Sequence, residues 1–390
     1  MRIYLDHAAT TPIRPEVLAS YTQALSAVGN PSSVHQFGQD ARNTLEAARE
    51  SLAGTVGANR SEIVFTSGGT ESDNLAIKGL FWQRIAEASN RNVIITAATE
   101  HHGALDPIYW LADHQGAEVV LLPVDHRGVF DLAWLDNYLA TSADRVALIS
   151  LMWVNNETGV IADIQSITDL ASRYGIPVHS DAVAALGHIE IDFAASGLAT
   201  MAISGHKVGG PVGSGALVVG RSVKITSLVH GGGQERGMRS GTMDSAGAQA
   251  FALAAKLASH SLLDESARLA SLSGRLIASI SKIAQDAVFS RGDAPGLETT
   301  LNFTFPGCSA DSMIFLLDAA GVSVSAGSAC TAGVNRPSHV LLGMGRTEDE
   351  ATGALRISLG YTTTETDVDR FLDAFPSVHA SAKKAGLPSK

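Results

Sequence analysis

Cysteine is nearly absent from this chain, which has 390 residues and only two thiols, Cys308 and Cys330. Two thiols are too few for the disulfide framework of a small secreted domain, and too few for a zinc site built from cysteines. We therefore expect no metal site, and each thiol has to be interpreted from its own surroundings.

Positive charge and long apolar runs are scarce as well. The chain has 28 lysines and arginines but 39 aspartates and glutamates, which gives a formal net charge of −11. Because no run of basic residues stands out, we expect neither nucleic acid nor an anionic membrane as a direct partner. No uncharged apolar stretch is long enough to span a bilayer, and the first residues lack the apolar core of a signal peptide. These absences favour a cytoplasmic protein.

Apolar residues are plentiful, at 45% of the chain, and charged residues make up 17%. This balance is typical of a well-packed enzyme and differs from that of a disordered or fibrous chain. A chain of 390 residues is too long for one ordinary core, so we expect a large domain at residues 15–260 and a smaller one at residues 261–390.

Strand-like and helix-like segments alternate along the large domain. Strands are predicted at residues 63–66, 92–96, 118–122, 146–153 and 177–180, and helices at residues 40–53, 74–85, after Gly103, at 132–139 and at 164–174. This alternation predicts an α/β fold with a mostly parallel sheet that has helices on both faces. Ligands of such sheets bind at the carboxyl ends of the strands, where the polar motifs of this chain also lie.

The alternation of strands and helices ends after Thr242. Helices are predicted at residues 246–257, 262–283, 311–319 and 365–375, and strands at residues 300–305, near 322 and at 356–359. The second of these helices is long enough to link the two domains. The rest predicts a small α+β domain.

One lysine stands out in the segment Ser204-Gly205-His206-Lys207. Apolar residues precede it and a glycine-rich run follows it, so we expect Lys207 at a strand end, in a partly dry turn. Desolvation and a nearby cation lower the pKa of an ammonium group, and the free amine can form a Schiff base with a carbonyl compound. A solvated loop lysine is the ordinary alternative.

Two upstream features argue against that alternative. Asp181 ends a short apolar strand, and a carboxylate beside a pyridinium nitrogen, paired with a Schiff-base lysine, is a known arrangement for pyridoxal phosphate (PLP). Gly69 and Thr70 lie where a predicted strand turns into a helix. Backbone N–H groups at a helix start bind phosphate with help from the helix dipole. A Gly-Gly-Thr turn by itself is also an ordinary helix cap.

A set of motifs along nearly the whole chain resembles the cysteine desulfurases of the NifS and IscS type. The motifs are at residues 4–11, 29–33, 66–74, 99–101, 154–157, 204–207, 231–236, 239–242 and 325–330. The resemblance implies the PLP-dependent transferase fold, that of aspartate aminotransferase, with PLP as the cofactor. It also implies that residues 1–14 join the small domain.

The resemblance further implies roles for individual residues. His101 would stack on the pyridine ring and assist proton transfer, for which a near-neutral pKa is suited. Asn156 would lie near the phenolic oxygen of PLP and near the substrate. Ser204 and His206 would contact the phosphate together with Gly69 and Thr70. Thr242 would reach the phosphate of a neighbouring subunit, which implies a homodimer.

One position departs from the family pattern Asp-x-x-Gln, since the glutamine is replaced by Ala184. An alanine cannot supply the amide hydrogen bond to the phenolic oxygen, so Asn156 or a water has to carry that contact. We expect a weakened or re-tuned cofactor site that is still functional, because the Schiff base and the phosphate contacts remain.

Arg356 interrupts an apolar strand. A buried arginine needs an anionic partner, and the carboxylate of an amino-acid substrate suits its planar guanidinium. An internal salt bridge is the alternative.

The two cysteines differ in their surroundings. Cys330 lies in Ser325-Ala326-Gly327-Ser328-Ala329-Cys330, a run of small residues that cannot pack a core, so we expect an exposed and mobile thiol. Cys308 suits the usual role of a small buried hydrophobic residue. A thiolate at Cys330 could attack the sulfur of a substrate and carry it to an acceptor.

The resulting hypothesis is a cysteine desulfurase with Lys207, Cys330 and His101 as catalytic residues and Arg356 and Asn156 at the substrate. Its partners would be L-cysteine and sulfur-acceptor proteins of iron–sulfur assembly or tRNA thiolation. Two alternatives remain open. One is a selenocysteine lyase or class-V aminotransferase of the same fold, and the other is a non-catalytic binding scaffold.

Overall fold

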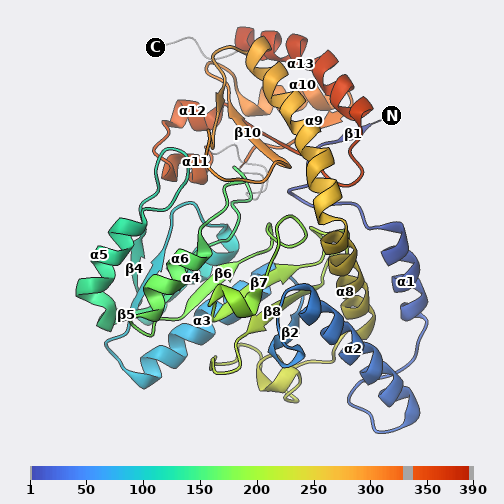
Figure 1. Cartoon of the computed structure of the whole chain (residues 1–390), viewed down its shortest axis with the longest axis vertical. Coiled ribbons are helices and arrows are strands. Elements are labelled where there is room, and N and C mark those ends of the chain that lie inside the picture. Colours follow the sequence, from blue (N-terminus) through green and yellow to red (C-terminus); the bar gives the residue numbers. More distant parts are fainter. Residues whose placement is uncertain (1, 328–336, 386–390) are drawn as a thin grey trace.

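The computed structural model describes residues 2–327 and 337–385, and its centre is a seven-stranded sheet (Figure 1). The strand order is β2-β8-β7-β6-β5-β3-β4. The strands are β2 (Ile63–Thr66), β3 (Val93–Thr96), β4 (Glu118–Leu121), β5 (Val146–Ser150), β6 (Val178–Asp181), β7 (Thr200–Ser204) and β8 (Gly215–Val219). β8 runs antiparallel to both of its neighbours, and the others run parallel to one another. The predicted α/β fold with a mostly parallel sheet is confirmed.

Helices cover both faces of this sheet, because successive apolar side chains of each strand point to opposite sides. Phe65 and Ile95 pack in one core and Val64 and Ile94 in others across the sheet. The core of Phe65 includes residues of α2 (Gln36–Thr55), α5 (Leu132–Ser142), α6 (Ile164–Ser172), α7 (Phe193–Ser196) and α8 (Ser245–His260). The cores of the other face include α3 (Gly69–Glu87) and α4 (His102–Gln115). Helix α1 (Pro15–Leu25) packs against α8.

The prediction for the start of α3 was wrong by more than a turn. The helix was expected at residues 74–85, but it begins at Gly69, inside the glycine turn that follows β2. The carboxylate of Glu71 accepts a hydrogen bond from the Ser67 N–H at 2.8 Å, which stabilises an early helix start. The free N–H groups of the first turn therefore lie at the glycines themselves.

A second unit with its own core follows α9 (Leu262–Ile283), the long helix that rises from α8 in Figure 1. Its elements are β9 (Val288–Phe289), β10 (Thr300–Thr304), α10 (Ala310–Ala319), β11 (Val322–Ser323), α11 (His339–Gly343), α12 (Glu348–Thr352), β12 (Ala354–Ser358) and α13 (Glu365–Ala385). Strands β12, β10 and β9 form an antiparallel sheet. Helix α13 runs ten residues beyond its predicted end at Phe375, because Val378 and Ala382 are still buried in the core.

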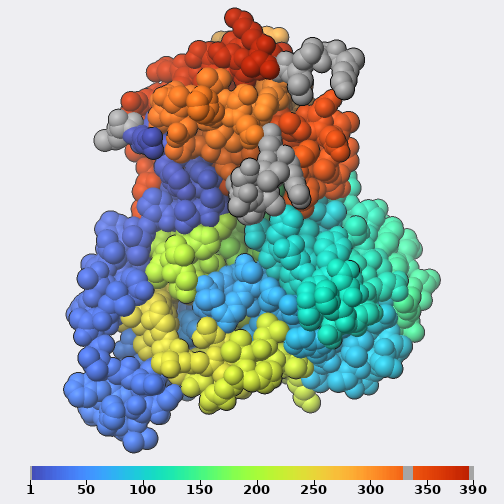
Figure 2. Space-filling model, turned by 180° about the vertical axis from the view of Figure 1, so that it is seen from behind, coloured from blue at the N-terminus to red at the C-terminus, as the bar shows by residue number. Residues whose placement is uncertain are grey.

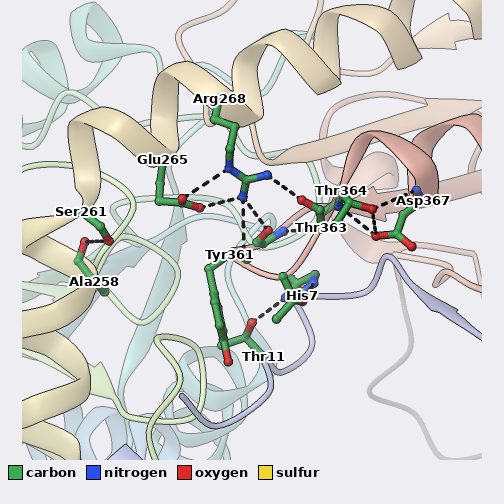
Figure 3. Close-up of polar contacts among 12 residues, drawn as sticks. His7, Thr11, Ala258, Ser261, Glu265, Arg268, Tyr361, Thr363, Thr364 and Asp367 are labelled. Carbon is green, nitrogen blue, oxygen red and sulfur yellow. Dashed lines mark hydrogen bonds and ion pairs between the residues drawn. The ribbon is translucent and has the colours of Figure 1, made fainter. Parts of the chain in front are cut away.

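The loop after β12 is attached to α9 by one arginine (Figure 3). Arg268 forms an ion pair with Glu265 at 2.8 Å and donates to the carbonyl oxygen of Thr363 at 2.5 Å. The start of α13 is therefore fixed against the long helix.

The N-terminal residues connect the second unit to the large sheet. Strand β1 (Ile3–Tyr4) pairs in parallel with β11, and Leu5 is buried in the second core. A few residues later, the N–H of Thr11 donates to the carbonyl oxygen of His206 at 3.0 Å. In Figure 2 this dark-blue segment lies between the orange part and the yellow-green part below it. The domain boundaries at residues 15–260 and 261–390 stay a prediction.

None of the helices in the described ranges combines the length and the apolar character needed to cross a bilayer.

Candidate active site

A cavity of about 270 Å³ lies where the carboxyl ends of the central strands meet the second unit and the N-terminal segment. Its volume is close to the lower end of the range for small-molecule sites, about 300 Å³. Eight of the residues predicted from the sequence line it: Gly69, Thr70, His101, Asn156, Asp181, His206, Lys207 and Arg356. The motifs that follow separate strands are therefore brought together, as the sheet topology requires.

Lys207 follows β7 in a tight turn, in which the N–H groups of Val208 and Gly210 both donate to the carbonyl oxygen of Gly205. The turn aims the lysine amine at the N-terminal segment, where it donates to the carbonyl oxygen of Ala8. The lysine charge acts on its neighbour: burial, and secondly the Lys207 cation, lowers the pKa of His206 to about 4. His206 is therefore a neutral ring at the cavity wall, and its Nδ1 lies 3.2 Å from the hydroxyl of Thr10.

The start of α3 forms a second part of the wall. A Cβ atom on Gly69 would lie 2.6 Å from Cγ2 of Val183, so a larger residue cannot replace this glycine without displacing the Val183 side chain. The unpaired N–H groups of this first helical turn can bind an anion. Ser204 lies next to the same turn but is buried behind it, and its hydroxyl donates to the carbonyl oxygen of Ser214 at 3.4 Å.

His101 caps the start of α4. The N–H of Gly103 donates to its Nδ1 at 2.9 Å, so the neutral ring carries its proton on Nε2. Burial is the main cause that lowers the pKa of His101. At neutral pH the ring is therefore uncharged and can donate from Nε2.

Asp181 ends β6, and its Oδ1 accepts the N–H of Val183 at 2.8 Å. Beside it lies Asp73, which sequence analysis did not select, with Oδ1 3.1 Å from Nε2 of His179. Burial, and secondly the charge of Asp181, raises the pKa of Asp73 well above its usual value, while burial lowers the pKa of His179 to about 3. Asp73 and His179 are therefore held as a neutral pair next to Asp181.

Arg356 lies on β12 and reaches the cavity from the second unit. Its Nη1 donates to the carbonyl oxygen of Asn156 at 3.0 Å, and its Nη2 forms an ion pair with Asp6 at 2.7 Å. The internal salt bridge considered as an alternative thus exists, although Arg356 also lines the cavity. The Oδ1 atom of Asn156 and the Nε atom of Arg356 are buried without a hydrogen-bond partner among the described residues.

Three predicted features lie elsewhere. Cys330 lies within residues 328–336, outside the described ranges. Thr242 is exposed, away from the cavity lining of this chain. Cys308 is buried in the second core, as predicted, and burial raises the pKa of its thiol.

Several lining residues besides Asp73 were not selected in the sequence analysis, among them Ala8 and Gly327. Both belong to motifs that carried the family resemblance, but only those motifs, and no chemical feature of alanine or glycine, could have indicated them. Ala8 acts through its backbone carbonyl, which any residue has.

The donor set of the cavity fits PLP. An amine, a carboxylate next to a neutral acid, and a glycine-containing helix start lie in one cavity, and they match the aldehyde, ring nitrogen and phosphate of that cofactor. The unpartnered amide oxygen of Asn156 further indicates that this wall is completed by a polar ligand.

Comparisons with protein families, with individual sequences and with solved structures all identify related proteins. The sequence profile of the aminotransferase class-V family matches residues 3–371. The chain is 46% identical to an IscS-like cysteine desulfurase of Mycobacterium tuberculosis (strain ATCC 25618 / H37Rv) over 98% of each chain. Among solved structures, a NifS-like protein from Rickettsia africae ESF-5 has a TM-score of 0.87 at 32% identity, covering 97% of this chain and 100% of that one. The structure of SspA in complex with cysteine has a TM-score of 0.80 at 35% identity, covering 92% of this chain and 98% of that one. The chain therefore belongs to the aminotransferase class-V family, among its IscS-like and NifS-like cysteine desulfurase members.

Proposed function

We propose that this protein is a PLP-dependent cysteine desulfurase, which removes the sulfur of L-cysteine and leaves L-alanine. The observation that carries the proposal is the cavity that joins Lys207, Asp181 and Arg356, from three separate elements. An amine, an acid and a guanidinium are the groups that an amino-acid substrate and its cofactor require. The related cysteine desulfurases and the cysteine complex of a structural neighbour support the choice of substrate.

The residues that would hold PLP follow from the donor set. Lys207 would bind its aldehyde, Asp181 its ring nitrogen, and Asn156 its phenolic oxygen, while His101 would lie against the ring. The phosphate would be held by Gly69, Thr70, Ser204 and His206, and by Thr242 of a second copy of the chain in a homodimer. When bound, PLP supplies an electron-withdrawing ring that acidifies the Cα–H bond of an attached amino acid.

Side chains of the protein would bind the substrate and transfer the protons. Arg356 and Asn156 would bind the substrate carboxylate and orient the Cα–H bond, and the amine of Lys207 would take the Cα proton. Nε2 of His101 would donate a proton within the cavity, because hydrogen bonding fixes its tautomer.

The sulfur would be transferred to Cys330. Its thiolate would attack the substrate sulfur, so that an S–S bond forms while the C–S bond breaks and its electron pair stays with the carbon chain. Protonation of that carbon, together with return of a proton to Cα from the amine of Lys207, would yield alanine, and the sulfur would remain on Cys330 as a persulfide. Acceptor proteins of iron–sulfur assembly or tRNA thiolation would receive it. A cytoplasmic location stays a prediction.

The proposal can be tested by incubating the PLP-loaded protein with L-cysteine under a reducing thiol. We expect alanine and sulfide in equal amounts. A selenocysteine lyase would convert L-selenocysteine and leave L-cysteine intact, and an aminotransferase would release a keto acid. A binding scaffold would take up no PLP and form no product. Any of these three results would contradict the proposal.

A substitution at Ala184 tests the re-tuned cofactor site. Ala184 lines the cavity next to Val183, and glutamine there would supply the amide of the family pattern to the phenolic oxygen of PLP. One neutral hydrogen bond contributes about 1 kcal/mol, so we expect Ala184→Gln to bind PLP about five-fold more tightly and to shift its absorption spectrum. The measurement is a PLP titration followed by absorbance. Ala184→Met, of similar length but without an amide, is the matched control. Equal affinity and spectra in all three proteins would show that the missing amide is irrelevant.

A further inference from the structure

Asp6 forms a partly buried ion pair with Arg356 at the edge of the cavity. Its Oδ1 lies 2.7 Å from Nη2 of Arg356, and the side chains of the two residues are 19% and 4% exposed. We propose that Asp6 is a positioning residue for the substrate carboxylate, because its ion pair holds the guanidinium of Arg356 in a fixed orientation before the substrate binds. This inference rests on the proposed role of Arg356.

The backbone places Asp6 rigidly. Ser358, two residues after Arg356 on β12, donates from its N–H to the carbonyl oxygen of Leu5 at 2.8 Å and accepts from the N–H of His7 at 3.3 Å. Its hydroxyl accepts from the N–H of Ala8 at 2.8 Å. Residues 5–8 are therefore joined to the end of β12 by a parallel bridge between Asp6 and Ser358, and this main-chain pairing places the Asp6 carboxylate at the guanidinium.

The hydrogen bonds of Arg356 leave room for a carboxylate ligand. A guanidinium has five N–H groups. Asn156 occupies one on Nη1 and Asp6 occupies one on Nη2, while Nε is buried without a partner among the described residues. Among the described residues, each terminal nitrogen thus keeps one N–H that can donate to the carboxylate of a ligand. The two existing contacts fix the plane of the group.

Charge gives a second reason for Asp6. A buried guanidinium without an anion is strongly unfavourable, so Arg356 would turn away or disturb its surroundings whenever the cavity lacks substrate. Asp6 supplies the missing negative charge in that state. The arginine is then preorganised, and less of the binding free energy of the substrate is lost in ordering it.

The same segment also contacts the lysine. Ala8, two residues after Asp6, accepts the hydrogen bond from the amine of Lys207. One short segment, residues 6–8, therefore contacts both the cation for the substrate carboxylate and the amine that acts at Cα. A ligand with both an amino group and a carboxylate on one carbon matches this arrangement.

The test compares ligands with and without a carboxylate on the PLP-loaded protein. The variants are Asp6→Ala and the isosteric Asp6→Asn, which keeps an oxygen but loses the charge. We expect Asp6→Ala to raise KM for L-cysteine at least about ten-fold with little change in kcat, because a charge-assisted hydrogen bond to the arginine is lost. By calorimetry, L-alanine should bind more weakly by a similar factor, and Asp6→Asn should give a smaller effect. Binding of cysteamine, which is cysteine without its carboxylate, should stay unchanged.

Tyr4→Phe is the matched control, since it removes the hydroxyl that donates to the carbonyl oxygens of Asp6 and Thr10 but leaves the ion pair intact. We expect it to leave the ratio of L-alanine to cysteamine affinity unchanged. The inference is overturned if Asp6→Ala weakens both ligands equally, which marks a purely structural role, or if L-alanine binds as well as before or more tightly. Arg356→Gln separates the two claims: if that variant itself leaves L-alanine binding intact, the proposed role of Arg356 fails.

Discussion

Replacement of Lys207 by alanine is expected to lower the rate of alanine formation from L-cysteine by about four orders of magnitude, because the variant loses both its cofactor-binding amine and its base. The structure gives this lysine no substitute nearby: among the described residues, it is the only lysine that lines the cavity. The measurement is alanine production by the PLP-saturated variant and by the wild-type protein.

A chemical readout separates loss of the amine from loss of folding. Borohydride reduction of the PLP-loaded wild-type protein should link the cofactor covalently to a peptide containing Lys207, and Lys207→Ala should remain unlabelled while it keeps its melting temperature. Lys224→Ala, at an exposed position outside the cavity lining, should retain both label and activity. A labelled peptide that contains another lysine would overturn the assignment of Lys207 and the proposed function with it.

The large sheet could be predicted well from the sequence because most of its strands are short apolar runs bounded by polar turns. β2 was predicted at its observed bounds, and Lys207 was expected at a strand end, where it follows β7. The antiparallel direction of β8 could not be predicted, because direction depends on the connection between β7 and β8 and not on the composition of the strand. Helix α1 has a single buried residue, Val17, so it lacks the apolar stripe that periodicity analysis detects.

In the candidate site, too, some residues could be predicted from the sequence and others could not. Lys207, Asp181 and the glycine turn were predictable because each follows a recognisable strand, and parallel strands present their carboxyl ends together. The contact between Asp6 and Arg356 was not predictable, since it joins residues 350 positions apart. It depends on the pairing of β1 with β11 and of residues 5–8 with β12, and a two-residue strand has no local signal. Asp73 was overlooked because its role arises from burial next to Asp181.

The second large effect is expected at Cys330. If its thiolate is the sulfur acceptor, Cys330→Ser should lower alanine and sulfide production by at least about three orders of magnitude, because a hydroxyl is far less nucleophilic at neutral pH. The steps before sulfur transfer use Lys207 and not the thiol. The variant should therefore still exchange the Cα hydrogen of L-cysteine for deuterium from D₂O, measured by mass spectrometry of the recovered amino acid.

Cys308→Ser provides the matched control for this variant. Cys308 is the other cysteine of the chain, and its thiol is buried in the second core with a raised pKa, so it is a poor nucleophile. Its replacement places a hydroxyl in an apolar site and should cost about 1–3 kcal/mol of stability, with turnover unaffected below the melting temperature. Full turnover in Cys330→Ser, or loss of turnover in Cys308→Ser, would contradict the transfer of the substrate sulfur to Cys330. Loss of both turnover and deuterium exchange in Cys330→Ser would instead place the thiol in the steps at Cα, where the proposed mechanism has no role for it.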